Sequence, residues 1–260
     1  MKRLFLLLSL TLSIIICYGK IALQKNADEV VIRNDYISLH LSKDRGWLPD
    51  KLEYSGIGTI LSDFHIYTDW GIYERGYVGS KEEKEGRISI DEKQGEVTVT
   101  AEGELKSKDK RMEEKIGYIV KFVVSNEPRL KVEVELKPQM KPRKVSAFLA
   151  HLFQVHSAKQ WMVNGLDGII SEDMNGEVGR MWESRNEPLS IDDPFIIVIT
   201  NWGQIHIDGI SSEPQAQNIF LFNGSGGNLV LFFGFLDGGL QEISTPFRVS
   251  YNIEFNPITR

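Results

Sequence analysis

Cysteine is nearly absent from this sequence: Cys17 is the single one among 260 residues. It lies in an N-terminal segment that we expect to be removed, so a hydrophobic core rather than disulfides must stabilise the rest of the chain. Basic residues are also few, with 30 Lys and Arg against 36 Asp and Glu, for a net charge of −6. A nucleic-acid binder needs a basic stripe, so we predict no nucleic-acid partner. The same balance disfavours an anionic polysaccharide and fits a neutral sugar better.

Several familiar motifs are missing too. The chain has no G-x-S-x-G, no H-E-x-x-H and no glycine loop that would cradle a phosphate. No segment strongly codes for a helix, and no repeat or low-complexity linker divides the chain. With cysteine chemistry also excluded from the mature chain, histidine and carboxylate chemistry remains. The acidic side chains near residues 167–177 do not have the spacing of a calcium loop, so we predict neither a metal site nor a cofactor.

The N-terminus has the layout of a secretory signal peptide. Lys2 and Arg3 precede an apolar run over Leu4 to Ile16, and small residues at Cys17 and Gly19 allow cleavage after Gly19. The run is too short for a transmembrane helix, so we predict no membrane span in the mature chain. We expect a secreted or periplasmic protein, with residues 20–260 as one domain. A lipoprotein anchored through Cys17 is the alternative, although Ile16 is bulky for such a site.

Alternating polar and apolar residues predict strands through most of the chain. The clearest are in EVTVTAEGEL and RLKVEVEL, within Glu96 to Lys106 and Arg129 to Lys137, and each has one buried and one wet face. Ile116 to Ser125, Asn218 to Asn223 and Phe247 to Phe255 are further strands. About fourteen strands in one domain predict an all-β fold, a large antiparallel sandwich of two sheets.

The stretch Val145 to Ser157 predicts a central strand that carries His151 and His156 among apolar neighbours. The apolar neighbours of His151 favour a hydrogen-bonded histidine within the core. A second stretch, Ile205 to Pro214, places His206 and Asp208 on one face of a strand. We expect these two stretches to face each other across a cleft of the size of a sugar.

Residues Ser55 to Ser80 are rich in glycine and aromatic side chains and have no sustained period. We expect a long ordered loop or several short strands here. Exposed aromatics such as Trp70 and Tyr73 suit a carbohydrate site, because sugar rings stack on flat apolar faces. The alternative is a loop packed down by its own aromatic side chains.

Three stretches resemble the aldose 1-epimerases, the galactose mutarotase-like proteins. These are His151-Leu152-Phe153-Gln154-Val155, Ser212-Glu213-Pro214-Gln215, and Asp237-Gly238-Gly239 with the closing strand VSYNIEF. The opening NDYISLHLSKDRGWLPDKLEYSG resembles the family's first hairpin. The resemblance implies a β-supersandwich fold and a sugar or glycan as partner.

By that resemblance, His151 would be the general acid on the sugar ring oxygen and Glu213 the base on the anomeric hydroxyl. Arg75, Trp70, His206 and Asp208 would contact the sugar, although no motif supports them. The chain would then be an epimerase-like isomerase or a relative of the polysaccharide lyases. The alternative is a non-catalytic carbohydrate-binding or structural envelope protein, with Trp70, Trp161 or Trp182 exposed and the histidines buried.

Overall fold

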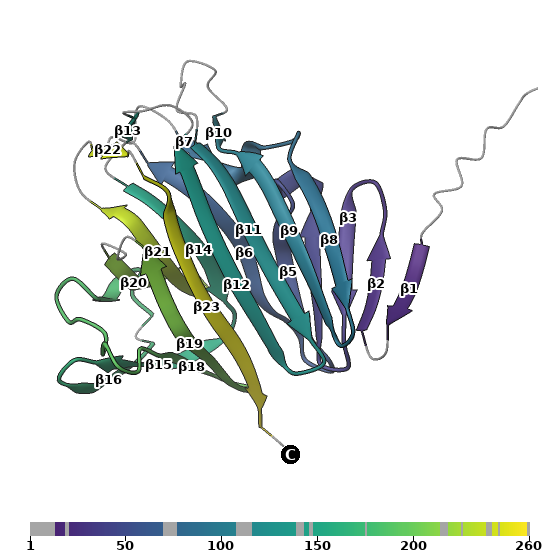
Figure 1. The fold of residues 1–260 in the computed structure, drawn as a ribbon. Helices are drawn as coiled ribbons and strands as arrows, with labels where there is room; N and C mark the ends of the chain where they lie inside the picture. Colours follow the sequence, from purple (N-terminus) through teal and green to yellow (C-terminus); the bar gives the residue numbers. More distant parts are fainter. Residues whose placement is uncertain are drawn as a thin grey trace, which may run out of the picture.

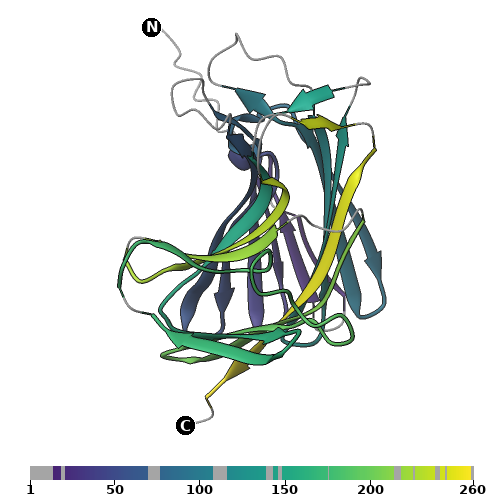
Figure 2. The ribbon, with the colours of Figure 1, turned by 90° about the vertical axis from the view of Figure 1, so that its left-hand side faces the viewer.

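The computed structural model describes residues 14–18, 21–69, 77–107, 116–138, 143–145, 148–174, 176–213, 218–224, 226–237, 241–243 and 245–258. These residues form antiparallel β-strands, with two single-turn 3₁₀ helices, η1 (Lys43–Arg45) and η2 (Ser80–Glu82), between them. Two large sheets pack face to face, one in front of the other in Figure 1 and nearly edge-on in Figure 2. The predicted all-β sandwich is confirmed.

The first sheet has twelve strands. Ten of them follow one another in space in the order β1-β2-β3-β4-β5-β6-β14-β21-β20-β17, and β7 and β10 extend the sheet beside β6. Their bounds are β1 Ile14–Tyr18, β2 Ile21–Lys25, β3 Glu29–Arg33, β4 Ile37–Ser42, β5 Leu48–Tyr54, β6 Gly58–Asp69, β7 Tyr77–Gly79, β10 Lys106–Ser107, β14 Phe148–Val155, β17 Gly179–Glu183, β20 Asn218–Asn223 and β21 Leu229–Asp237.

The second sheet has nine strands in the order β16-β15-β18-β19-β23-β12-β11-β9-β8. Their bounds are β8 Arg87–Lys93, β9 Glu96–Glu104, β11 Ile116–Ser125, β12 Arg129–Pro138, β15 Ala158–Gly165, β16 Gly168–Asp173, β18 Ile196–Thr200, β19 Gly203–Glu213 and β23 Phe247–Pro257. A small pair, β13 (Arg143–Val145) with β22 (Gln241–Ile243), lies at the top in Figure 1.

The core lies between the two sheets because each long strand alternates. On β11, Val120 and Phe122 are fully buried while Lys121 between them points to solvent. On β14, Leu149 and Phe153 face the same core from the other sheet. Each sheet therefore has an inner face of apolar side chains and an outer face that is available for other purposes.

Of the two expectations for Ser55 to Ser80, a long ordered loop or several short strands, the structure shows strands in the part that it describes, and residues 70–76 lie outside that part. Residues Gly58–Asp69 form β6, a strand of 12 residues that pairs with β5 and β14 in the middle of the first sheet. Asp63 has a positive φ of 60°, and the β6–β14 register shifts between Leu152 and Gln154. This irregularity interrupts the two-residue period of the strand. Because both faces of β6 are largely buried, polar and apolar residues also do not alternate along it.

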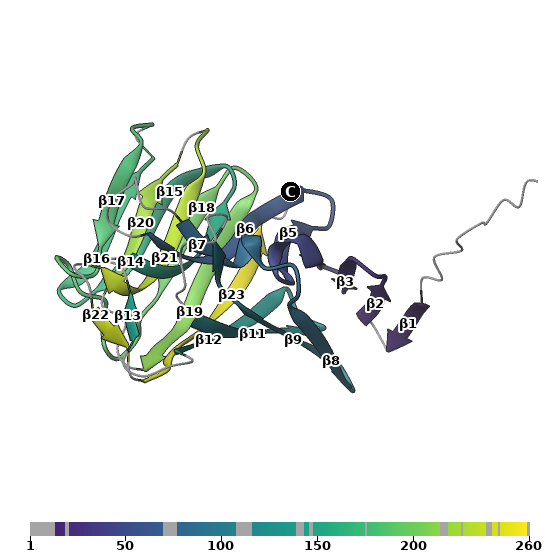
Figure 3. The ribbon, with the colours of Figure 1, turned by 90° about the horizontal axis from the view of Figure 1, so that it is seen from above.

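β1 lies within the segment that we predict to be a signal peptide. Among the described strands it pairs with β2 alone, along the margin of the first sheet, at the right in Figures 1 and 3. Cleavage after Gly19 would remove β1 and leave β2 as the edge strand, with the rest of the sheet intact.

Candidate functional site

His151 lies on β14, and its side chain is sealed in the core with no exposed surface. Its Nδ1 is 3.2 Å from the backbone oxygen of His65, and its Nε2 is 2.6 Å from the hydroxyl of Tyr251. Because a carbonyl oxygen only accepts, Nδ1 donates to His65 and Nε2 accepts from Tyr251. Burial lowers the pKa of His151 to about 3, so the imidazole is neutral at pH 7. These contacts are those of a satisfied core histidine.

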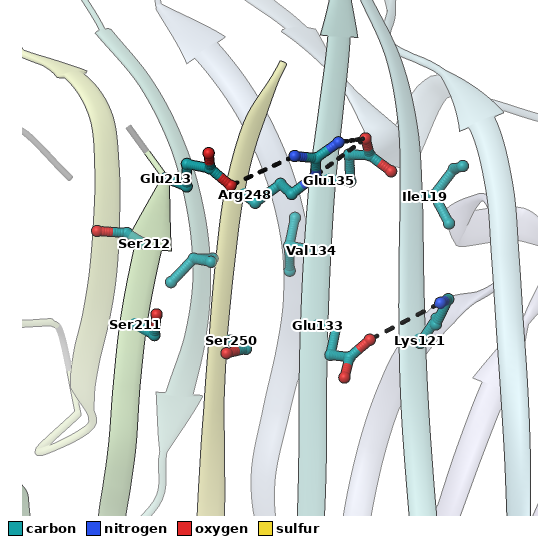
Figure 4. A pocket seen from close by; sticks show the side chains of 11 residues that line it. Ile119, Lys121, Glu133, Val134, Glu135, Ser211, Ser212, Glu213, Arg248 and Ser250 are labelled. Atoms are coloured by element: carbon teal, nitrogen blue, oxygen red, sulfur yellow. Dashed lines mark hydrogen bonds and ion pairs between the residues drawn. The ribbon is translucent and has the colours of Figure 1, made fainter. Parts of the chain in front are cut away.

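Glu213 lies on β19, on the outer face of the nine-stranded sheet, with its side chain 80% exposed. Arg248 lies between Glu213, at 3.4 Å, and Glu135, at 2.9 Å. These side chains line an open groove of about 320 Å³ that continues past Lys121 and Glu133, a second ion pair (Figure 4). We call this surface, the outer side of β11, β12, β23 and β19, the charged face.

The structure does not bring His151 and Glu213 together. They lie on different sheets, and the imidazole points into the packed core while the carboxylate points to solvent. The expectation that their two stretches face each other across a cleft is wrong, because apolar side chains fill the space between the sheets. The acid–base pair stays a prediction that these positions do not support.

Of the predicted sugar contacts, His206 and Asp208 are brought together and two others lie outside the described residues. His206 and Asp208 are two positions apart on β19, so both point outward from the nine-stranded sheet. They meet Glu254 of β23, with the ligand atoms of all three side chains within 4.8 Å of one another. Trp70 and Arg75 belong to residues that the structure does not describe.

A different surface gathers aromatic rings and paired carboxylates. It is the outer side of β6, β14, β21 and β20, and we call it the aromatic face. The cross-strand register places Tyr67 beside Ala150, and Phe220 beside Phe232. Among the described residues, the aromatic side chains of this face are Tyr67, Phe148, Phe220, Phe222 and Phe232.

Phe148 is the centre of this aromatic face. Its ring centroid is 5.2 Å from that of Tyr67 and 6.0 Å from those of both Phe220 and Phe232. Phe220 and Phe232 stack at 4.4 Å with their planes 12° apart. Gly234 lies in the same layer, and a Cβ there would stand 2.7 Å from the backbone oxygen of Asn218, so only glycine fits. The rings thus form one continuous apolar layer, in which Phe220 is buried and the other four rings are partly exposed.

Two carboxylates, Glu183 and Asp237, border the aromatic face. Asn218 is fully buried, and its Nδ2 donates to Glu183 Oε2 at 2.9 Å and to Asp237 Oδ2 at 2.7 Å. Arg180 Nη1 bridges the same two oxygens at 2.7 and 3.4 Å, while Arg185 Nη2 is 3.2 Å from Asp237 Oδ2. The two carboxylate oxygens are therefore held close together by shared donors.

The surroundings keep Glu183 ionised. The hydrogen bond from Asn218, with the nearby Arg180, holds the pKa of Glu183 below its usual value. The guanidinium carbon of Arg180 also lies 4.1 Å from the centroid of the Phe220 ring, a cation–π contact. Glu183 is ionised at neutral pH and presents an acceptor beside an arginine and an aromatic surface.

The opposite end of the aromatic face has its own polar cluster. His65, next to Tyr67 at 5.5 Å, is buried, and burial together with Lys81 lowers its pKa to about 4. Burial alone would raise the pKa of Asp63, but His65, Lys81 and Arg45 outweigh it and lower the pKa. Polar groups thus lie at both ends of the row of rings.

Sequence reasoning missed this site. Trp161 and Trp182, proposed as parts of an aromatic platform, are each 2% exposed and belong to the core, so the expectation is wrong for these two positions, while Trp70 lies outside the described residues. The available signal was in NIFLFN and LVLFFGFLD, where large apolar side chains occupy both alternating sets of positions. One of those faces had to point away from the core.

Solved structures with this fold are known, although the sequence is far from them. A galactose 1-epimerase from Lactobacillus acidophilus NCFM matches with a TM-score of 0.56 at 8% identity, covering 95% of this chain and 99% of the other. The Slr1438 protein from Synechocystis sp. PCC 6803 matches with a TM-score of 0.52 at 10% identity, covering 98% and 99%. No protein-family model and no curated protein matches the sequence. The fold is therefore a distant galactose mutarotase-like sandwich, and this likeness defines the fold alone.

Among the described residues, no helix is long and apolar enough to span a membrane.

Proposed function

We propose that this protein binds a carbohydrate on the aromatic face without transforming it. The observation that carries the proposal is the position of Glu183 and Asp237, held by Asn218 and Arg180 at the border of a continuous row of aromatic rings. A sugar offers apolar C–H faces and hydroxyl groups. Rings suit the first, and carboxylates beside arginines suit the second.

The charges favour binding over acid–base catalysis. Opening a hemiacetal ring needs a base and also a group that delivers a proton near neutral pH. Glu183, whose pKa is lowered, is ionised at pH 7 and can act there only as a base. His65, with a pKa of about 4, is neutral at pH 7 and does not act as a cationic acid. His151 is sealed in the core.

The structural comparison adds support for a sugar ligand. The Lactobacillus structure is that of a galactose 1-epimerase, and its fold extends over nearly the whole of this chain. Because one fold can host unrelated functions, this comparison supports the proposal only together with the rings and carboxylates of the aromatic face.

A glycan array followed by calorimetry tests the proposal. Arg180→Ala is the informative variant, and Arg248→Ala is its matched control, because each arginine bridges two carboxylates on an outer face. We expect Arg180→Ala to weaken glycan binding more than about tenfold, the loss of a charge-assisted hydrogen bond. Arg248→Ala should leave the affinity unchanged.

Two results would overturn the proposal. One is an array on which the wild-type protein binds no glycan. The other is a ligand whose affinity depends on Arg248 and not on Arg180. Anomeric exchange followed by proton NMR should show no acceleration by the wild-type protein, and acceleration that is lost in Glu213→Gln would restore the enzymatic alternative.

We also propose that the protein is exported through an N-terminal signal peptide. The basic start, the apolar run and the small residues before Lys20 support cleavage after Gly19. The intact mass of the protein from the periplasm or medium should correspond to a chain that begins at Lys20. A mass that includes Met1 would contradict export by this route, and a lipid on Cys17 would identify the lipoprotein alternative.

A further inference from the structure

We propose that His206, Asp208 and Glu254 bind a divalent transition-metal ion on the outer face of the nine-stranded sheet. This site is separate from the aromatic face, which lies on the other sheet. The proposal does not depend on the carbohydrate ligand.

The register of two neighbouring strands assembles the three side chains. His206 of β19 pairs directly with Glu254 of β23, and Asp208 lies two residues further along β19 on the same face. One ligand atom from each lies within 4.8 Å of the others. A metal bond of about 2.0–2.2 Å to each would draw these atoms closer by small rotations of side chains that are only half-buried.

His206 is the residue whose surroundings point most directly to a missing partner. Its Nε2 is buried and makes no hydrogen bond within the part of the chain that the structure describes. The ring of Phe195 lies edge-to-face with the imidazole at 5.4 Å, and it offers no nitrogen or oxygen partner. Buried polar atoms are nearly always satisfied, and one left without a partner costs about 1–3 kcal/mol. A metal ion bound at Nε2 would remove that cost.

Asp208 is held in place as a metal ligand would be. Its Oδ1 accepts from Asn252 Nδ2 at 2.8 Å and is 3.2 Å from Arg129 Nη2. Both contacts use the same oxygen, which leaves Oδ2 to bind an ion. Hydrogen bonds of this kind fix the orientation of metal-binding carboxylates in known sites.

The donor set selects the class of ion. One imidazole nitrogen with two carboxylates suits Zn²⁺, Co²⁺ or Ni²⁺, whereas Ca²⁺ and Mg²⁺ prefer oxygen donors alone. Three protein ligands leave at least one coordination position for water or a ligand.

His40 shows that one histidine beside two carboxylates does not always form a metal site. It also lies between two carboxylates on neighbouring strands, with Nδ1 3.1 Å from Glu29 and Nε2 3.1 Å from Glu53. Each carboxylate occupies a different nitrogen, on opposite sides of the ring, so the three groups cannot converge on one ion. His40 is therefore a matched control for His206.

Calorimetric titration of the tag-free protein with ZnCl₂, after dialysis against a chelator, tests the site. We expect one ion per chain in the wild-type protein and in His40→Gln. His206→Gln and Glu254→Gln should each weaken the affinity more than about tenfold. Circular dichroism checks that the variants remain folded.

A second measurement uses the wild-type protein alone, so it stays decisive if a variant unfolds. In imidazole ¹⁵N NMR spectra, Zn²⁺ should shift the His206 signals at one equivalent and leave those of His40 in place. No saturable binding by the wild-type protein would overturn the proposal. So would unchanged affinity in folded His206→Gln, or a shift of His40 instead of His206.

Discussion

The two outer faces of the sandwich carry the same charge arrangement in different surroundings. On the charged face, Arg248 bridges Glu135 and Glu213, whose side chains are 22% and 80% exposed. On the aromatic face, Arg180 bridges Glu183 and Asp237, which are 20% and 15% exposed. The difference lies in the support: Arg180 also covers the Phe220 ring, and the carboxylates also share the buried Asn218.

This difference decides which face is organised to bind. An exposed ion pair is weak, because water screens its charges and both side chains lose freedom when they pair. Charges beside apolar rings and buried donors interact more strongly and are already oriented for a ligand. An arginine between two carboxylates therefore does not by itself indicate a binding site. The groups that pack against the arginine and the carboxylates distinguish a binding site from an exposed ion pair.

The largest expected contrast between the faces is in stability. Phe220→Ala removes a ring that is 2% exposed and stacked on Phe232, and should lower the free energy of unfolding by about 3–5 kcal/mol. Ile119→Ala, at a half-buried position on the charged face, should cost about 1 kcal/mol. Urea unfolding monitored by circular dichroism measures both. Equal losses would show that the aromatic face is not a packed layer.

The strands of the charged face could be predicted well from the sequence. Arg129 to Lys137 alternates strictly, and the structure has β12 at Arg129–Pro138. One face of this strand meets the core and the other meets water, so the period of two survives. The sandwich itself followed from many such strands and from the resemblance of the chain's first hairpin and closing strands to a known fold.

The aromatic face could not be predicted in the same way. Phe148, Phe220 and Phe232 come from three strands that meet only through the order β14-β21-β20. Nothing local in the chain specifies that order, and both faces of these strands are largely apolar, which hides the period. The resemblance directed attention to His151 as an acid, whereas the alternation around His151 had already favoured a satisfied core histidine.

A smaller effect should appear when the free energy of unfolding is measured as a function of pH. The folded-state pKa values of His151 and His65 are lowered from about 6.5 to about 3 and about 4. Between these values the unfolded chain binds more protons than the folded one, so stability is full above pH 6.5 and falls as the pH drops towards 4. Each group contributes a slope of up to about 1.4 kcal/mol per pH unit.

The variant His151→Phe isolates one of these two groups. The free energy of urea unfolding, measured at pH 7.0, 6.0 and 5.0, should fall less steeply in His151→Phe than in the wild-type protein, whatever the variant's absolute stability. Parallel profiles would mean that His151 titrates normally and is accessible to water, which would reopen its assignment as a general acid.

The smallest expected effect comes from the two bridging arginines in the absence of ligand. Arg180→Ala should lower the free energy of unfolding by about 0.5–1 kcal/mol, because it removes the cation–π contact with Phe220 and one donor to the carboxylate pair. Arg248→Ala should leave the melting temperature unchanged within error, since Glu135 keeps Lys137 at 3.2 Å and Glu213 is solvated. Thermal melts at low and at 0.5 M salt separate the causes. A loss in Arg180→Ala that disappears at high salt would reduce this contact to an exposed ion pair, and the two faces would then differ in composition but not in organisation.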